Sequence, residues 1–122
     1  MTYIKSYKEL IVWQKSILLV KEVFQTTALF PKSEMFGITS QMRRAAVSIP
    51  SNIAEGSARK TRKDFGQFIA IAYGSALELE TQSLISKDLH LANADEFSKM
   101  DMLLEEVLKM LNVINTKFSS RI

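Results

Sequence analysis

Apolar residues recur at steps of three and four over four long stretches of the chain, which is the spacing of amphipathic α-helices. The first helix is predicted to begin after Ser6 and to run to about Thr27, because Ser6 and Glu9 have the spacing of a capping box. Its predicted core stripe contains Leu10, Trp13, Ile17, Val20 and Phe24. Pro31, in the loop that follows, interrupts the helical pattern.

The second helix is predicted to cover roughly Glu34 to Ser57, with Gly56 near its end. Its buried stripe would contain Ile38, Met42, Ala45 or Ala46, Ile49 and Ile53. Thr61 and Asp64 can cap a third helix that runs to about Leu89. The side chains predicted to point inward from this helix are Phe65, Phe68, Ile69, Ala72, Ala76 and Leu79.

The fourth helix is predicted to open at Asn93 to Glu96 and to reach nearly to the C-terminus. Its apolar positions form a coiled-coil-like seam of Phe97, Met100, Leu104, Val107, Leu111, Ile114 and Phe118. Four helices with short connections predict an all-α fold, an antiparallel up-down-up-down four-helix bundle. A chain of 122 residues is the size of one domain, so we expect a single four-helix-bundle domain over residues 1–122.

The first and last helices carry more apolar residues than a monomeric bundle must bury. The additional positions are Ile11, Val12, Leu18, Leu19 and Val23 in the first helix, and Leu103, Leu108, Met110 and Val113 in the last. Exposed apolar surface of this kind usually marks a subunit interface, so we expect a homo-oligomer. In the third helix, Gly66, Ala70 and Gly74 recur every four residues, which we interpret as tight packing within the subunit.

The composition limits which cellular compartments and which kinds of functional site are compatible with the chain. The chain has no cysteine, which excludes disulfides and thiolate metal sites and fits a reducing compartment. The N-terminus lacks the apolar core of a signal peptide, and the aliphatic run from Ile17 to Val20 falls far short of the roughly 20 residues that span a bilayer. We therefore expect a cytoplasmic protein without a membrane partner.

Charge is distributed unevenly along the chain. Residues 1–40 have a net charge of +2, residues 41–63 of +5 and residues 64–122 of −4. A basic centre followed by an acidic half favours one cationic face that meets nucleic acid or an acidic partner. The alternative is a solvated basic face that pairs with the acidic half of the same or a neighbouring subunit.

A polar stripe follows one side of the second helix, opposite the apolar one, and consists of Arg44, Ser48, Ser51, Glu55 and Arg59. Pro50 lies inside this helix, where it removes the hydrogen bond to the carbonyl of Ala46 and is expected to kink or break the helix. Ser48, Ser51 and Asn52 are therefore interpreted as local repair, together with an i,i+4 pair between Glu55 and Arg59, or else as direct ligand contacts. We treat Ser48, Pro50, Ser51, Asn52, Glu55 and Gly56 as a structural motif.

The basic cluster of Arg59, Lys60, Arg62 and Lys63 lies between the second and third helices. Cations suit the C-terminal end of the second helix but oppose the dipole at the start of the third, and a bound phosphate would relieve that conflict. The candidate nucleic-acid contacts are Arg43, Arg44, Arg59, Lys60, Arg62 and Lys63. Because no aromatic residue is interleaved with them before Phe65, we expect mainly electrostatic binding with little sequence preference.

Catalytic patterns are weak. His90 is the only histidine, and di-iron bundles need Glu-x-x-His pairs on two helices. Glu78 and Glu80 point to different sides of a helix, and no phosphate loop or serine-base-acid spacing occurs. We therefore expect a nonenzymatic protein with no catalytic residues, cofactor or metal.

Several motifs together resemble a known family. They are Trp13, FPKSE at 30–34, QMRRA at 41–45, SIPSNIAEG at 48–56 and IAYGSALELE at 71–80. Over almost the whole chain they resemble the four-helix-bundle proteins encoded in intervening sequences of bacterial 23S rRNA genes, which are labelled ribosomal or intervening-sequence proteins. The fold of that family is similar to that of the accessory variability proteins of diversity-generating retroelements, which form pentameric barrels that bind nucleic acid and a reverse transcriptase.

The resemblance implies an antiparallel bundle, a homopentamer and no catalytic residues. It leaves two binding functions open beside a purely structural bundle whose charges only keep it soluble. The first is an oligomeric RNA- or DNA-binding module, associated with rRNA. The second is a scaffold whose basic rim docks a protein partner, such as a nucleic-acid enzyme like a reverse transcriptase, with the oligomer supplying multivalency. Co-purification with a partner after nuclease treatment would favour the scaffold.

Overall fold

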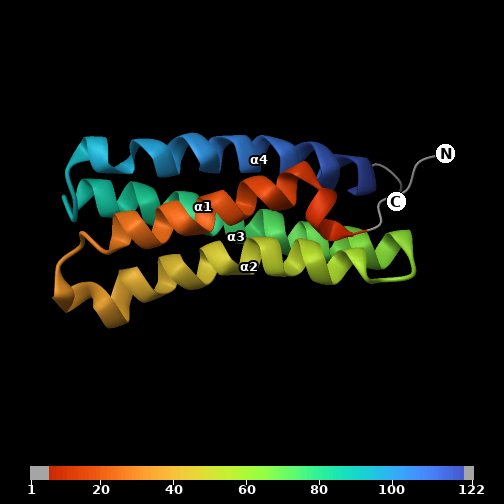
Figure 1. Cartoon of the computed structure of the whole chain (residues 1–122), viewed down its shortest axis with the longest axis horizontal. Coiled ribbons are helices and arrows are strands. Elements are labelled where there is room, and N and C mark those ends of the chain that lie inside the picture. Colours follow the sequence, from red (N-terminus) through yellow and green to blue (C-terminus); the bar gives the residue numbers. More distant parts are fainter. Residues whose placement is uncertain (1–5, 120–122) are drawn as a thin grey trace.

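Four α-helices make up most of the computed structural model, which describes residues 6–119. They are α1 (Ile11–Thr27), α2 (Ser40–Ser57), α3 (Arg62–Asp88) and α4 (Ser98–Ser119). Successive helices run in opposite directions, and each helix packs on its two neighbours around a square: α1 on α2, α2 on α3, α3 on α4 and α4 on α1 (Figure 1). This arrangement confirms the predicted all-α four-helix bundle.

The helices α2, α3 and α4 bury most of the stripes that their periodicity predicts, whereas Phe68 and Phe118 at the end of the bundle are half-buried. The fully buried members with the largest side chains include Met42, Ile49, Ile53, Ile69, Leu79, Phe97, Met100 and Leu111. Phe65, Ile38 and Ile114 are half-buried and pack against this core. Burying each of these larger side chains contributes roughly 1.5–3 kcal/mol, so the seam of the bundle carries most of the hydrophobic stabilisation.

The predicted stripe of α1 is wrong. The buried apolar residues of this helix are Val12, Leu19 and Val23, whereas Phe24 is 40% exposed. The other residues of the predicted stripe are half-buried at the rim: Leu10, Trp13, Ile17 and Val20. Both sides of α1 are apolar, so spacing alone offers two stripes, and only the positions of α2 and α4 decide which one is buried. Ser16 is also fully buried, and its hydroxyl is satisfied by donating to the Trp13 carbonyl at 2.7 Å.

Three predicted helix starts are displaced by short turns. Ser6 caps a 3-10 turn (Tyr7–Glu9), where its Oγ accepts from the Lys8 N–H at 3.2 Å, rather than capping α1 itself. Before α2 come a 3-10 turn (Lys32–Glu34) and a π-helical turn (Met35–Thr39), inside which Gly37 has the non-helical angles φ −109° and ψ −118°. A 3-10 turn (Ala94–Phe97) precedes α4 in the same way.

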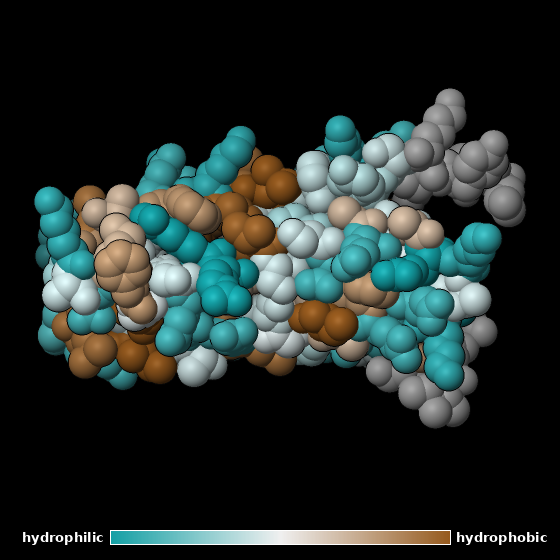
Figure 2. All heavy atoms as spheres, turned by 90° about the horizontal axis from the view of Figure 1, so that it is seen from below, coloured by the Kyte–Doolittle hydropathy of each residue, from teal (hydrophilic) through white to brown (hydrophobic). Residues whose placement is uncertain are grey.

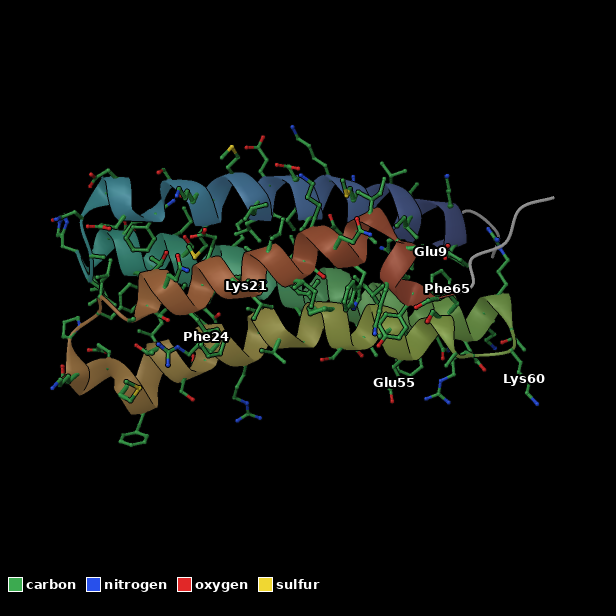
Figure 3. The ribbon with its side chains drawn as sticks, in the orientation of Figure 1. Glu9, Lys21, Phe24, Glu55, Lys60 and Phe65 are labelled. Atoms are coloured by element: carbon green, nitrogen blue, oxygen red, sulfur yellow. The ribbon has the colours of Figure 1, made fainter. Side chains whose placement is uncertain are left out.

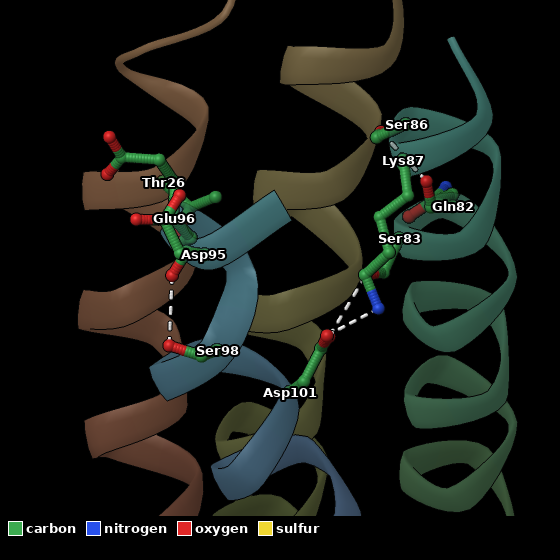
Figure 4. Close-up of polar contacts among 9 residues, drawn as sticks. All are labelled: Thr26, Gln82, Ser83, Ser86, Lys87, Asp95, Glu96, Ser98 and Asp101. Carbon is green, nitrogen blue, oxygen red and sulfur yellow. Dashed lines mark hydrogen bonds and ion pairs between the residues drawn. The ribbon is translucent and has the colours of Figure 1, made fainter. Parts of the chain in front are cut away.

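Polar side chains occupy part of the buried side of α3, and the partners of their hydroxyls lie nearby (Figure 4). Ser83 donates to Asp101 Oδ1 of α4 at 3.1 Å, and Lys87 forms an ion pair with the same carboxylate. Ser86 donates to the Gln82 carbonyl at 2.8 Å. These bonds satisfy hydroxyls that would otherwise cost free energy when removed from water.

The sides of α3 are unusual for a bundle helix. Its buried side consists mainly of small and polar residues: Ala72, Ala76, Gln82, Ser83 and Ser86, with Ile69 and Leu79. Its outward side carries large apolar residues that are 40–61% exposed: Ile71, Leu77, Leu84, Ile85 and Leu89. Large exposed apolar side chains grouped on one side of a helix usually mark a surface that another chain covers. We call these five exposed residues the α3 outer face.

Candidate nucleic-acid interface

The connection between α2 and α3 lies at the end of the bundle where α4 also ends (Figure 1). The four basic side chains here, Arg59, Lys60, Arg62 and Lys63, are all exposed. Figure 3 shows Lys60 pointing away from the bundle at this end. We call these four residues the junction cluster.

The chain turns sharply at the junction cluster for local reasons. The helix α2 ends where Arg59 N–H donates to the Gly56 carbonyl at 3.0 Å. Thr61 is the N-cap of α3, and its Oγ1 accepts from the Asp64 N–H at 3.1 Å, which confirms the predicted cap. The Asp64 carboxylate in the first turn of α3 partly offsets the unfavourable interaction of Arg62 and Lys63 with the helix dipole.

Two cations of the junction cluster lie over aromatic rings. The Arg59 guanidinium is 4.6 Å from the Phe68 ring centroid, and the Arg62 guanidinium is 4.3 Å from that of Phe118. Arg59 also pairs with Glu55 at 3.7 Å, as predicted for this i,i+4 spacing. Within residues 6–119, Lys60 and Lys63 form no ion pair or hydrogen bond through their side chains. The junction cluster thus presents positive charge whose arginines are held in place by packing.

The rings beneath the cluster pack closely. Phe65 and Phe118 form an edge-to-face pair with centroids 5.3 Å apart. A Cβ added to Gly56 would lie 2.7 Å from Phe68 Cβ, so only glycine lets the end of α2 approach α3 this closely. Gly66 has a similar role, because a Cβ there would lie 2.9 Å from the Phe118 ring. The interpretation of Gly66 as tight packing within the subunit is confirmed, whereas Gly74 faces open space.

Arg43 does not join the junction cluster. It donates to Thr27 Oγ1 at 2.9 Å and to the Phe24 carbonyl at 3.4 Å, and lies 4.7 Å from the Phe24 ring centroid. It therefore binds the C-terminal end of α1, where a cation is favourable. Arg43 and Ser57, the last residue of α2 before the junction cluster, are about 21 Å apart along the helix at 1.5 Å per residue. Figure 3 shows the corresponding separation between Phe24 and Lys60.

Arg44 lies beside Arg43, also remote from the junction cluster. It is exposed and lines a shallow hollow between α1 and α2 with Phe24 and Val47. On the face of the bundle where α2 lies, hydrophobic groups form separate patches among hydrophilic ones (Figure 2). The six candidate contacts thus divide into a pair in the first half of α2 and the junction cluster.

The motif around Pro50 links α2 to α3. Asn52 Nδ2 donates to the Ser48 carbonyl at 2.8 Å and to Ser48 Oγ at 2.9 Å, and the Ser48 hydroxyl is hydrogen-bonded to that of Ser75 at 2.8 Å. Pro50 is buried and Ser51 is exposed. The predicted break of the helix is wrong, because α2 continues through Pro50. These bonds hold Ser48 and Asn52 in local structure, but none of them reaches the Ala46 carbonyl that Pro50 frees, so the predicted repair of that group stays a prediction.

A comparison with known protein families identifies the family of this chain. Residues 8–113 match the family described as 23S rRNA-intervening sequence protein. The chain belongs to this family. The match includes the Pro50 motif and the whole junction cluster, and it confirms the resemblance seen in the sequence motifs.

One solved structure similar to this family member is a protein of unknown function from the S23 ribosomal protein family of Bacteroides thetaiotaomicron. It is 22% identical, with a TM-score of 0.79 over 86% of this chain and 98% of the other. At that identity the likeness shows the fold alone. No curated protein sequence matches the chain.

Three other features of this family member concern metal binding, membrane insertion and the single histidine. Among residues 6–119, no group of three or more His, Asp or Glu side chains is arranged to hold a metal ion. No helix in the same part of the chain is long and apolar enough to cross a membrane. His90 is exposed in the turn after α3, with φ 54°.

The sequence did not single out Tyr7 as a residue of the site, and it predicted Phe118 as a core residue and not as a neighbour of a cation. Tyr7 lines a hollow together with Arg59 and Phe65, and Phe118 supports Arg62. More than 50 positions separate each of these aromatic residues from the basic side chain beside it. No pattern within one helix signals such a contact, so only the packed bundle reveals it.

Proposed function

We propose that this member of the 23S rRNA-intervening sequence protein family is a nonenzymatic, oligomeric protein that binds RNA through the junction cluster. The observation that carries the proposal is the concentration of four exposed cations at one end of the bundle, two of them held over phenylalanine rings. Family membership supports an association with rRNA. Arg43 is excluded from the proposed site, because its guanidinium is already engaged at the end of α1.

The proposed binding is chiefly electrostatic. Four phosphate contacts should make log K fall with log salt at a slope of about −3 to −4. The cations lie next to the N-terminus of α3, where free N–H groups also favour an anion. Among the described residues, Arg59 is the one member of the cluster paired with an acidic side chain, at 3.7 Å and in an exposed position, so only one weak ion pair has to break when phosphate binds.

The test is fluorescence-polarisation binding to structured RNA and to duplex DNA across a salt series. In the variant, Arg59, Lys60, Arg62 and Lys63 are all changed to Ala. The matched control removes the same charge from exposed lysines elsewhere, with Lys21, Lys32, Lys99 and Lys109 changed to Ala. We expect the junction variant to lose the salt-dependent affinity and the control to retain most of it, with equal oligomeric mass in all preparations.

Two results would count against the proposal. Equal losses in the junction variant and the control would mean that only net charge matters. No binding at low salt would instead favour the second candidate, a scaffold that docks an acidic or nucleic-acid-bearing protein. Recovery of a partner after nuclease treatment would then be the next measurement.

Oligomerisation is part of the proposal and is supported by the α3 outer face. Its five large apolar side chains are 40–61% exposed. A second copy of the chain that covers this face would bury apolar area that is otherwise in water. The family resemblance implies five copies, and several junction clusters in one assembly would strengthen RNA binding by multivalency.

A further inference from the structure

A hollow opens beside the junction cluster, between the turn that precedes α1 and the end of α2. Its volume is about 550 Å3. The turn contributes Tyr7 and Leu10, the end of α2 contributes Ser57 and Arg59, and α3 contributes Phe65. Figure 3 shows Phe65 beside the turn that carries Glu9. Three separate segments of the chain thus build one concave surface.

The lining combines two aromatic rings with a cation at the edge. Tyr7 makes an edge-to-face contact with Trp13, with centroids 5.2 Å apart, and Phe65 makes the same kind of contact with Phe118. Each ring is therefore held in position by a second ring, so little conformational freedom remains to be lost on binding. Arg59 belongs both to the hollow and to the junction cluster, which joins the two surfaces.

A planar, apolar group attached to a polyanion fits this combination. Single-stranded nucleic acid offers such groups, because its unpaired bases stack on aromatic side chains while cations bind the phosphates. Bases inside a duplex are stacked and paired, and would have to leave the helix to enter the hollow. The chemistry of the hollow therefore favours single strands or loops over continuous duplex.

We propose that this hollow takes an unpaired base of a single-stranded RNA segment whose phosphates lie on the junction cluster. The inference rests on the proposed function and narrows its substrate class. It also revises the prediction of mainly electrostatic binding, which rested on the absence of aromatic residues among the cations of the basic segment. In the folded chain, Tyr7 and Phe65 supply the stacking surface from outside the basic segment.

The test compares two labelled strands of equal length and phosphate number at low salt. One is a short unstructured RNA, and the other carries abasic sites in place of nucleotides. We expect the intact protein to bind the base-bearing strand roughly tenfold more tightly, which is the order of one stacked base. Tyr7→Ala should abolish most of this difference and leave binding of the abasic strand unchanged, whereas Tyr7→Phe should retain it.

Two further variants keep the test decisive. Ser57→Leu fills the exposed mouth of the hollow without changing either ring, and should reduce binding of the base-bearing strand as Tyr7→Ala does. Phe36→Ala removes an aromatic side chain that is 97% exposed outside the hollow, and should change neither affinity. Circular dichroism and oligomeric mass establish that each variant folds and assembles normally.

The outcomes separate the two proposals. Equal affinity of the intact protein for both strands, or equal losses for both in Tyr7→Ala, would overturn the base site and leave the junction cluster as an electrostatic site. Failure of the abasic strand and the RNA to bind at all would overturn the proposed function, and the base site with it.

Discussion

At the scale of single residues, Gly56 and Gly74 have opposite surroundings. A Cβ at Gly56 would meet Phe68 Cβ at 2.7 Å, whereas one at Gly74 meets nothing within 4 Å. We expect Gly56→Ala to lower the free energy of unfolding by about 1–3 kcal/mol through overpacking. Gly74→Ala should raise it by about 0.5–1 kcal/mol, because alanine favours the helix.

Urea unfolding at one fixed protein concentration measures both glycine changes. An unchanged midpoint for Gly56→Ala would show that the end of α2 can move away from α3 at little cost. A destabilised Gly74→Ala protein would indicate instead that another chain packs closely on that position.

The backbone conformation of His90 leads to a prediction about the free energy of unfolding. It lies just after α3 with φ 54°, and the next residue, Leu91, donates its N–H to the Ser86 carbonyl at 3.1 Å. Glycine adopts this left-handed conformation without steric cost, and histidine does not. We expect His90→Gly to raise the free energy of unfolding by about 1 kcal/mol in thermal or urea unfolding. Destabilisation would show that the imidazole makes a contribution beyond the turn.

At the scale of elements, the start of α3 connects stability to the candidate site. Thr61 caps the helix by accepting from the Asp64 N–H at 3.1 Å. Thr61→Ala should lower the free energy of unfolding by about 1 kcal/mol, and should increase amide hydrogen exchange in the first turn of α3. The matched control is Thr81→Ala in the middle of the same helix, where the hydroxyl bonds only its own helix, to the Leu77 carbonyl. Equal losses in both variants would contradict a role for the cap.

The starts of α2 and α4 show what the spacing of apolar residues can predict and what it cannot. The starts of α2 and α4 are later than predicted, because turns other than α-helix occupy Met35–Thr39 and Ala94–Phe97. Spacing detects apolar positions but cannot distinguish a 3-10 or π-helical turn from the first turn of an α-helix. The angles at Gly37, φ −109° and ψ −118°, are likewise invisible in the pattern of side chains.

At the scale of the whole molecule, the exposed apolar surface determines the expected assembly. The sequence favoured an interface on the first and last helices, where Ile11, Leu18 and Val113 are 46–60% exposed, and the structure adds five large apolar residues on the α3 outer face. We expect Leu84→Lys to weaken association by roughly tenfold to a hundredfold, the equivalent of about 1.5–3 kcal/mol for a buried leucine.

Light scattering over a range of protein concentrations measures that assembly. Met102→Lys, at a residue of α4 that is 59% exposed, is the matched control and should leave the mass unchanged. The reverse result, with Met102→Lys dissociating the protein and Leu84→Lys having no effect, would move the interface to α4.

The sequence by itself determined the features that depend on residues three or four positions apart. These include the four helices, the core stripes of α2, α3 and α4, the cap at Thr61 and the pair between Glu55 and Arg59. Each is set within one or two helical turns, where spacing specifies which side chains are neighbours.

Only the tertiary structure decided which face of α1 is buried, that Arg43 binds the end of α1, and that Tyr7 lies beside Arg59. The physical reason is that these contacts join different helices or turns, so they depend on how the helices rotate and align when they pack. Where a helix is apolar on two sides, as α1 is, its own spacing is equally compatible with either orientation. The packing of its neighbours then selects one.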